Sequence, residues 1–241
     1  MVTRIIVTLN QFGPYLKKED VESIVQFGSL QGTAFEATKE QLESFFRLPF
    51  SALSKEILER YIDITTPEYH VVIAPHTEEI RARLLKPLML AKKSYCLGDY
   101  LLTIASCGVV GEMLAILVWK INEVKIRNAP ISEEDEKGLF GSSFENLGQE
   151  KRLKILKTFK FVNDDQFENF GKIRNSRKPY LHLWKNKLEA SGEKEDALEV
   201  LKLSFKLFKD ITGIGLATAG TVTVNPLLTK LFKHLVEEDK S

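Results

Sequence analysis

LGDYLLTIASCGVVGEMLAILVWKI, residues 97–121, is the most apolar stretch of this 241-residue chain. Between Leu101 and Trp119 its only charged residue is Glu112. A run of this length fits either a transmembrane span or a helix buried in a protein core. An acid in the middle of a span costs roughly 2.5–3.5 kcal/mol on insertion scales, and the rest of the chain has the pattern of a soluble protein. We therefore expect a buried core helix.

One face of this expected helix combines its single acid with small residues three or four positions apart. The face consists of Ala105, Gly108, Glu112 and Ala115, with Trp119 at its end. Small side chains beside Glu112 would let a second helix approach closely. A carboxylate buried at such a contact needs a cationic or hydrogen-bonding partner. Arg174 and Arg177 are the candidates for that partner.

Composition places the chain among soluble globular proteins, with 44% hydrophobic and 28% charged residues. Cys96 and Cys107 are expected within one helix, far apart along its axis, which argues against a disulfide and favours a reducing compartment. The N-terminus shows no secretory signal pattern. We expect a cytoplasmic protein with no membrane partner.

Helical periodicity dominates the remaining chain, so the sequence predicts a mainly α fold. Residues 1–94 are expected to form a helical extension with one or two short strands, and residues 95–241 a helical bundle. Thr38 is expected as an N-cap, with Gln41 completing a capping box. The other expected helices cover 17–27, 54–64, 78–94 (restarting or kinked at Pro87), 149–159, 164–177 and 195–211, with a last one from Asn225; strands are expected over 3–9 and 70–74. Loops are expected over 128–148, with at most a short helix, and over 213–220.

Positive charge is concentrated between Lys151 and Lys187, where eleven Lys and Arg face three acids. The local charge of +8 leaves −7 for the rest of a chain whose net charge is +1. A basic segment on an otherwise acidic protein can be the footprint of a phosphate-bearing partner. It can equally be the solvated face of an amphipathic helix, which is the expected role for 151–160. His70 and His76 lack a third ligand nearby, so we expect surface or structural histidines there rather than a metal site.

The stretch IRNSRKPYLHLW, residues 173–184, joins two arginines, an asparagine and one of the four histidines. Pro179 disfavours helical geometry at Lys178, so the helix carrying the arginines should end or kink there. Arg174 is followed by Asn175 and precedes His182 by seven intervening residues, whereas four residues separate Arg177 from His182.

An Arg with a following polar residue, a short spacer and a His, late in a helical bundle, resembles the HEPN superfamily over about residues 95–235. The resemblance implies a small all-helical domain, often a homodimer. Many members are metal-independent endoribonucleases of toxin–antitoxin and antiviral defence systems, and others only bind nucleotides, nucleic acid or a protein partner. A ribonuclease acting on single-stranded RNA and a non-catalytic interaction module are therefore both open.

In the ribonuclease reading the RNA 2′-OH is the nucleophile, so neither metal nor cofactor is expected. His182 would move the proton, Arg174 or Arg177 would hold the scissile phosphate, and Asn175 would orient a phosphate oxygen or the imidazole ring. Residues expected to contact RNA are Lys151, Arg152, Lys154 and Lys178, with Tyr180 or Trp184 stacking on a base. Alternatively, His182 caps a helix and Trp184 belongs to the core. Expected partners are a second copy, RNA, and a cognate antitoxin or other partner protein.

Overall fold

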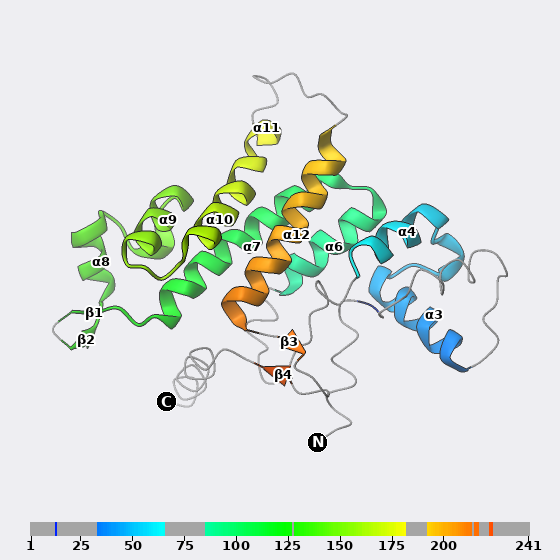
Figure 1. The fold of residues 1–241 in the computed structure, drawn as a ribbon, viewed down its shortest axis with the longest axis horizontal. Coiled ribbons are helices and arrows are strands. Elements are labelled where there is room, and N and C mark those ends of the chain that lie inside the picture. Colours follow the sequence, from blue (N-terminus) through cyan, green and yellow to red (C-terminus); the bar gives the residue numbers. More distant parts are fainter. Residues whose placement is uncertain are drawn as a thin grey trace.

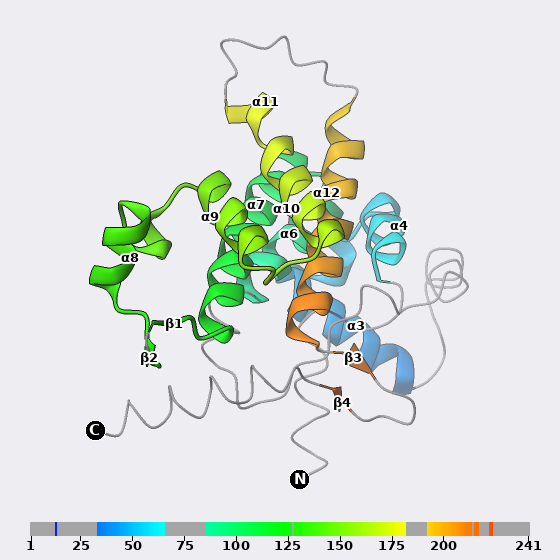
Figure 2. The same cartoon turned by 60° about the vertical axis from the view of Figure 1, so that its left-hand side comes forward.

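The computed structural model describes residues 13, 33–65, 85–126, 128–181, 192–213, 215–216 and 222–223. Over these residues the protein is mainly α-helical, as the sequence predicts (Figure 1). The strands in this part of the chain form two short antiparallel hairpins. Helices α3 (Thr33–Phe46) and α4 (Lys55–Asp63) lie at one end of the molecule and α8 (Glu133–Phe140) at the other, in both views (Figures 1 and 2).

Helix α7 (Tyr100–Ile121) is the centre of the bundle. It packs against α6 (Lys86–Leu97), α9 (Gln149–Thr158), α10 (Asp164–Ser176) and α12 (Glu193–Thr212). Among the described residues it is the one helix long and apolar enough to cross a membrane by length and composition, and 61% of its apolar window is buried inside the protein. Its place between four helices is that of the expected core helix.

Two residues, Gly98 and Asp99, separate α6 from α7. Gly98 has a φ of 84° and ends α6, and the Asp99 carboxylate then accepts a hydrogen bond from the Leu102 amide at 3.0 Å to begin α7. Pro87 stands in the first turn of α6, where its ring is tolerated. A helix kinked or restarted at this proline was predicted, and residues 66–84, which precede it, lie outside the described part of the chain. Cys96 and Cys107 consequently lie on two helices, and the prediction of one helix for both was wrong. Both are buried free thiols.

Helix α10 begins with a capping box at Asn163. The Asn163 carboxamide accepts from the Gln166 amide at 2.8 Å, and the Gln166 side chain accepts from the Asn163 amide at 3.1 Å. The helix ends at Ser176, and α11 (Lys178–Leu181) follows directly with Pro179 as its second residue. The predicted end of this helix before Pro179 is confirmed, but the break falls at Arg177, and Lys178 is itself helical. The basic stretch spans this junction.

The two N-terminal helices join the same hydrophobic core as the bundle. Ser54, at the start of the helix predicted over 54–64, caps α4 by accepting a hydrogen bond from the Ile57 amide at 3.4 Å. Thr38, in contrast, lies inside α3, because the preceding residues 33–37 contain no helix breaker and continue the helix. Its prediction as an N-cap was wrong. The boundary expected between residues 94 and 95 lies inside helix α6 and not in a linker.

Short elements complete the described part. Strands β1 (Lys125–Ile126) and β2 (Ala129–Pro130) form a hairpin, followed by α8 and the 3-10 turn η5 (Phe144–Asn146), which fits the short helix allowed within 128–148. Strands β3 (Gly215–Leu216) and β4 (Val222–Thr223) pair antiparallel, so the expected loop over 213–220 contains a strand. The strands expected over 3–9 and 70–74, and the helices over 17–27 and from Asn225, lie outside the described residues.

Candidate functional site

Two glycines of α7 bring α10 against it. A methyl group on Gly108 would lie 2.1 Å from Cδ of Arg177, and one on Gly111 would lie 3.3 Å from Cγ2 of Ile173. Gly108 therefore provides the slot in which the Arg177 side chain lies. The expected close approach beside Glu112 is present on this face, whereas Ala105, predicted to belong to it, is exposed to solvent.

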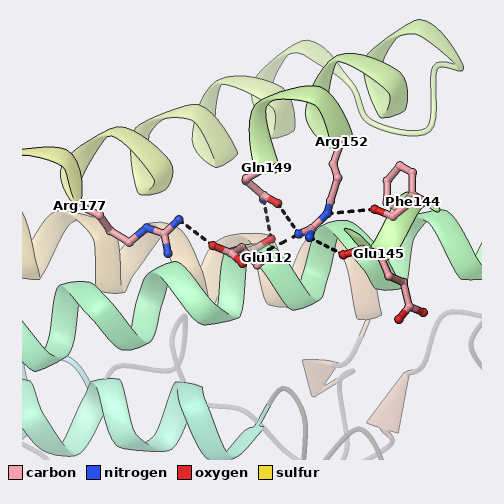
Figure 3. A network of polar contacts seen from close by, with 7 residues as sticks. Glu112, Phe144, Glu145, Gln149, Arg152 and Arg177 are labelled. Carbon is pink, nitrogen blue, oxygen red and sulfur yellow. Dashed lines mark hydrogen bonds and ion pairs between the residues drawn. The ribbon is translucent and has the colours of Figure 1, made fainter. Parts of the chain in front are cut away.

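Glu112 binds one of the two arginines expected to reach it. The Arg177 Nη2 donates to Glu112 Oε1 at 2.8 Å, and Arg152 Nη1 stands 4.0 Å from the other carboxylate oxygen (Figure 3). The Glu112 side chain retains 34% of its exposure and that of Arg177 retains 21%. The pair thus lies at the border between core and solvent and joins the C-terminal end of α10 to the middle of α7.

The Arg152 guanidinium donates its hydrogen bonds to groups inside the protein. Its Nε donates to the Phe144 carbonyl at 3.2 Å, Nη2 to the Glu145 carbonyl at 2.7 Å, and Nη1 to Oε1 of Gln149 at 3.1 Å (Figure 3). Burial lowers the pKa of Arg152, and the charges of Glu112 and Glu145 act against that shift. Arg152, expected on the RNA-facing surface, instead holds η5 against the start of α9.

Gln149 was not singled out by its sequence position, yet it links the same elements. Its amide nitrogen donates to the Gly111 carbonyl at 3.1 Å while its oxygen accepts from Arg152. The Gly111 residue leaves its own carbonyl approachable because no side chain covers it. A glutamine at the first position of an amphipathic helix carries no sequence signal that would have identified this role.

The remaining basic residues of the candidate site lie on the surface and most contact oxygen atoms of the protein. Arg174 Nη2 is 2.5 Å from Glu150 Oε2, and Lys154 pairs with the same glutamate at 3.0 Å. The Lys151 ammonium donates to the Phe140 carbonyl. The hydrogen bonds to Glu150 from Lys154 and Arg174, together with their charges, lower its pKa. Arg174 and Arg177 are thus directed to carboxylates on two different helices.

Asn175, Lys178 and Tyr180 occupy the end of the arginine helix and the turn after it. Asn175 and Lys178 are exposed. Tyr180 donates its hydroxyl proton to Asp196 Oδ2 at 3.0 Å, which ties α11 to the first turn of α12. Burial, followed by this hydrogen bond, raises the pKa of Tyr180 to about 12. His182 and Trp184 lie outside the described residues, as do His70 and His76.

A separate pocket of about 510 Å³ opens at the other end of α7, between β2, α8 and η5. Four glutamates and one lysine contribute its charges. Glu136 accepts from Trp119 Nε1 and from the Phe144 amide, each at 2.7 Å, and Glu145 pairs with Lys120 at 2.6 Å. Its negative sign disfavours a phosphate ligand. No three His, Cys, Asp or Glu side chains gather as metal ligands in the described parts of the chain.

Fold and site together define a mainly α-helical protein with an arginine–carboxylate network between its central helix and two neighbouring helices. No family model matches the chain, and neither a curated protein nor a solved structure matches it.

Proposed function

We propose that this chain is a HEPN-like helical protein that acts as a non-catalytic interaction module, placed in the cytoplasm by its composition. The observation that carries the proposal is the bond from Arg177 to Glu112 across Gly108. An arginine with a half-buried carboxylate partner stabilises the bundle, and its charge is already compensated when a phosphate approaches. Arg174 is compensated in the same way by Glu150.

A metal-independent endoribonuclease is the second candidate. Glu112 engages one nitrogen of the Arg177 guanidinium, and this arginine stands four intervening residues before His182. In that case the carboxylate would orient Arg177 toward a scissile phosphate, and His182 would carry the proton. RNA, a cognate antitoxin or another protein are the partner classes that fit these two readings.

Two alanine variants on the same helix test the structural role of Arg177. Arg177→Ala leaves the half-buried Glu112 without its closest cation, so we expect the free energy of unfolding to fall by about 1–3 kcal/mol. Arg174→Ala is the matched control, because its partner Glu150 is exposed and solvent-exposed pairs add little to stability. Urea unfolding followed by circular dichroism gives both values. Equal losses would contradict the structural role of Arg177.

An RNA cleavage assay in EDTA distinguishes the non-catalytic interaction module from the metal-independent endoribonuclease. Wild-type protein and His182→Ala are incubated with single-stranded RNAs of varied sequence, and the module proposal expects the same absence of cleavage products from both. EDTA-resistant cleavage that the His182→Ala variant loses would overturn the module and establish the ribonuclease.

A further inference from the structure

The pocket at the C-terminal end of α7 has an apolar wall that is fixed by packing. Its volume of about 510 Å³ lies within the ~300–1,000 Å³ that is typical of pockets for small ligands. The apolar wall consists of Trp119, Val124, Pro130, Ile131 and Phe144. The rings of Trp119 and Phe144 are stacked, with centroids 4.4 Å apart and planes that differ by 3°. The pocket can therefore hold the apolar body of a small ligand.

The charged side chains of the same pocket carry an excess of negative charge. Four glutamates and one lysine line the pocket, which gives a formal charge of −3. The lysine, Lys120, pairs with Glu145 at 2.6 Å. Glu133 pairs at 3.1 Å with Lys137, which does not line the pocket. Because apolar walls of low dielectric constant concentrate the field of such charges, the pocket favours a cationic ligand.

Glu136 is held against the apolar wall by two neutral donors. Its Oε1 accepts from Trp119 Nε1 and its Oε2 accepts from the Phe144 amide, each at 2.7 Å. The ion pairs that the described residues form around this pocket are made by other glutamates, and Glu136 takes part in none of them. An ionised carboxylate has about four acceptor sites. The half-buried Glu136 therefore keeps both its negative charge and acceptor sites for a ligand.

We propose that this pocket binds an organic cation, that is, an ammonium or guanidinium group on an apolar stem. The cation bonds to Glu136, and the stem lies against the wall that contains Trp119 and Phe144. A metal ion is disfavoured, because no three His, Cys, Asp or Glu side chains gather as ligands in the described part of the chain. A free amine and a lysine or arginine side chain of a partner protein share the chemistry required.

The indole N–H of Trp119 reports on the pocket, because it donates to Glu136. The chain has two tryptophans, so the Trp119 signal in a proton–nitrogen correlation NMR spectrum is the one that remains in Trp184→Phe. The probe is cadaverine, which is lysine without its carboxyl group, and pentanol is its uncharged counterpart. Cadaverine should shift the Trp119 signal with a Kd on the order of 1 mM, and pentanol should leave the signal in place. This test involves no RNA and does not depend on the proposed module.

Two neighbouring glutamates of α8 provide a charge-matched pair of variants. Glu133→Gln and Glu134→Gln each remove one negative charge from the exposed first turn of the helix, but only Glu133 lines the pocket. Glu133→Gln should raise the Kd for cadaverine about twofold to fivefold, and Glu134→Gln should leave it unchanged. Glu136→Gln should raise it about tenfold or more, because the bond to the ammonium loses its charge. The comparison of Glu133→Gln with Glu134→Gln changes no buried contact, so it decides the question even if Glu136→Gln loosens η5.

Four results would overturn the proposal. A Trp119 signal that cadaverine leaves unchanged excludes the cation site, and an equal shift with pentanol would show a pocket that selects only apolar ligands. Equal weakening by Glu133→Gln and Glu134→Gln would reduce the effect to a general attraction between an acidic surface and a cation. An equal shift with calcium chloride at the same concentration would assign the carboxylates to a metal ion.

Two capped tripeptides identify the source of the cation. Glycyl-lysyl-glycine and glycyl-norleucyl-glycine have the same backbone and differ in the ammonium group at the end of the middle side chain. Tighter binding of the lysyl peptide than of cadaverine would support a lysine side chain of a partner protein as the ligand. Tighter binding of cadaverine would support a free amine. Equal affinities of the lysyl and norleucyl peptides would contradict the recognition of a cation.

Discussion

Lys92 is a buried lysine in the core between α4 and α6, and its titration should control the pH dependence of stability. Its side chain is 1% exposed, with the ammonium 4.4 Å from the centroid of the Tyr61 ring and 5.5 Å from that of Phe45. Burial lowers the pKa of Lys92 to about 7, and the nearby Cys96 acts in the opposite direction. The aromatic faces attract the charged form, but they do not replace its lost hydration.

A folded-state pKa below the unfolded value of 10.5 means that the folded protein binds fewer protons between these two values. Stability therefore rises as the pH increases through this window. Summed over the whole window the gain is about 5 kcal/mol, at 1.36 kcal/mol per unit of pKa difference. Between pH 6 and pH 8 linkage gives about 1 kcal/mol. Above pH 8 the two buried cysteines oppose the gain, because burial raises the pKa of Cys96 and of Cys107 to about 12.

Lys92→Met keeps the length of the side chain and removes the titration. Urea unfolding at pH 6, 7 and 8 should show that wild type gains about 1 kcal/mol more than the variant over this range, and that the variant is the more stable protein at pH 6. The two proteins differ only at residue 92, so the contributions that they share cancel in the comparison. Lys86→Met, at the exposed first residue of α6, is the control and should follow the wild type. Equal pH slopes for wild type and Lys92→Met would refute the reasoning.

Two other changes test how the bundle is held together. Gly108→Ala should lower the free energy of unfolding by about 1–3 kcal/mol, because the methyl group displaces Arg177 from Glu112. Gly171→Ala on α10 is the control: nothing lies within 4 Å of the added methyl group, so the free energy of unfolding should rise by up to about 1 kcal/mol. A loss of stability at both sites would contradict the assigned contact between Gly108 and Arg177. Asn163→Ala removes the capping box of α10 and should cost about 1 kcal/mol in urea unfolding, with no change expected if another group caps the helix.

Periodic elements with clear ends could be predicted from the sequence alone. Helices α4, α9, α10 and α12 match the predicted ranges within about two residues, because each combines an apolar stripe with a capping or breaking residue. The need of Glu112 for a cation could also be predicted, since a carboxylate in an apolar helix has few other stable environments. Which of the two arginines, Arg174 or Arg177, binds Glu112 could not be predicted. It depends on which residue faces the Gly108 slot, and that follows from how two helices pack.

Contacts made by irregular backbone were not predictable. Arg152 is buried because η5 presents two carbonyl groups to it, and no periodic pattern records where a turn directs its carbonyls. The break at Gly98 was missed for a different reason: the residues on both sides are apolar, so hydrophobicity alone continues through it. The Gly98-Asp99 pair, a helix stop followed by an N-cap, was the signal that would have separated Cys96 from Cys107.

Glu112 lies at the border between the core and the solvent. On α7 it stands between the side covered by α10 and the exposed side, so its carboxylate reaches Arg177 without entering the dry core. A fully buried carboxylate would lose more hydration than one ion pair restores, and a fully exposed pair would contribute little because water screens it. The half-exposed position therefore suits an ion pair that joins α10 to α7.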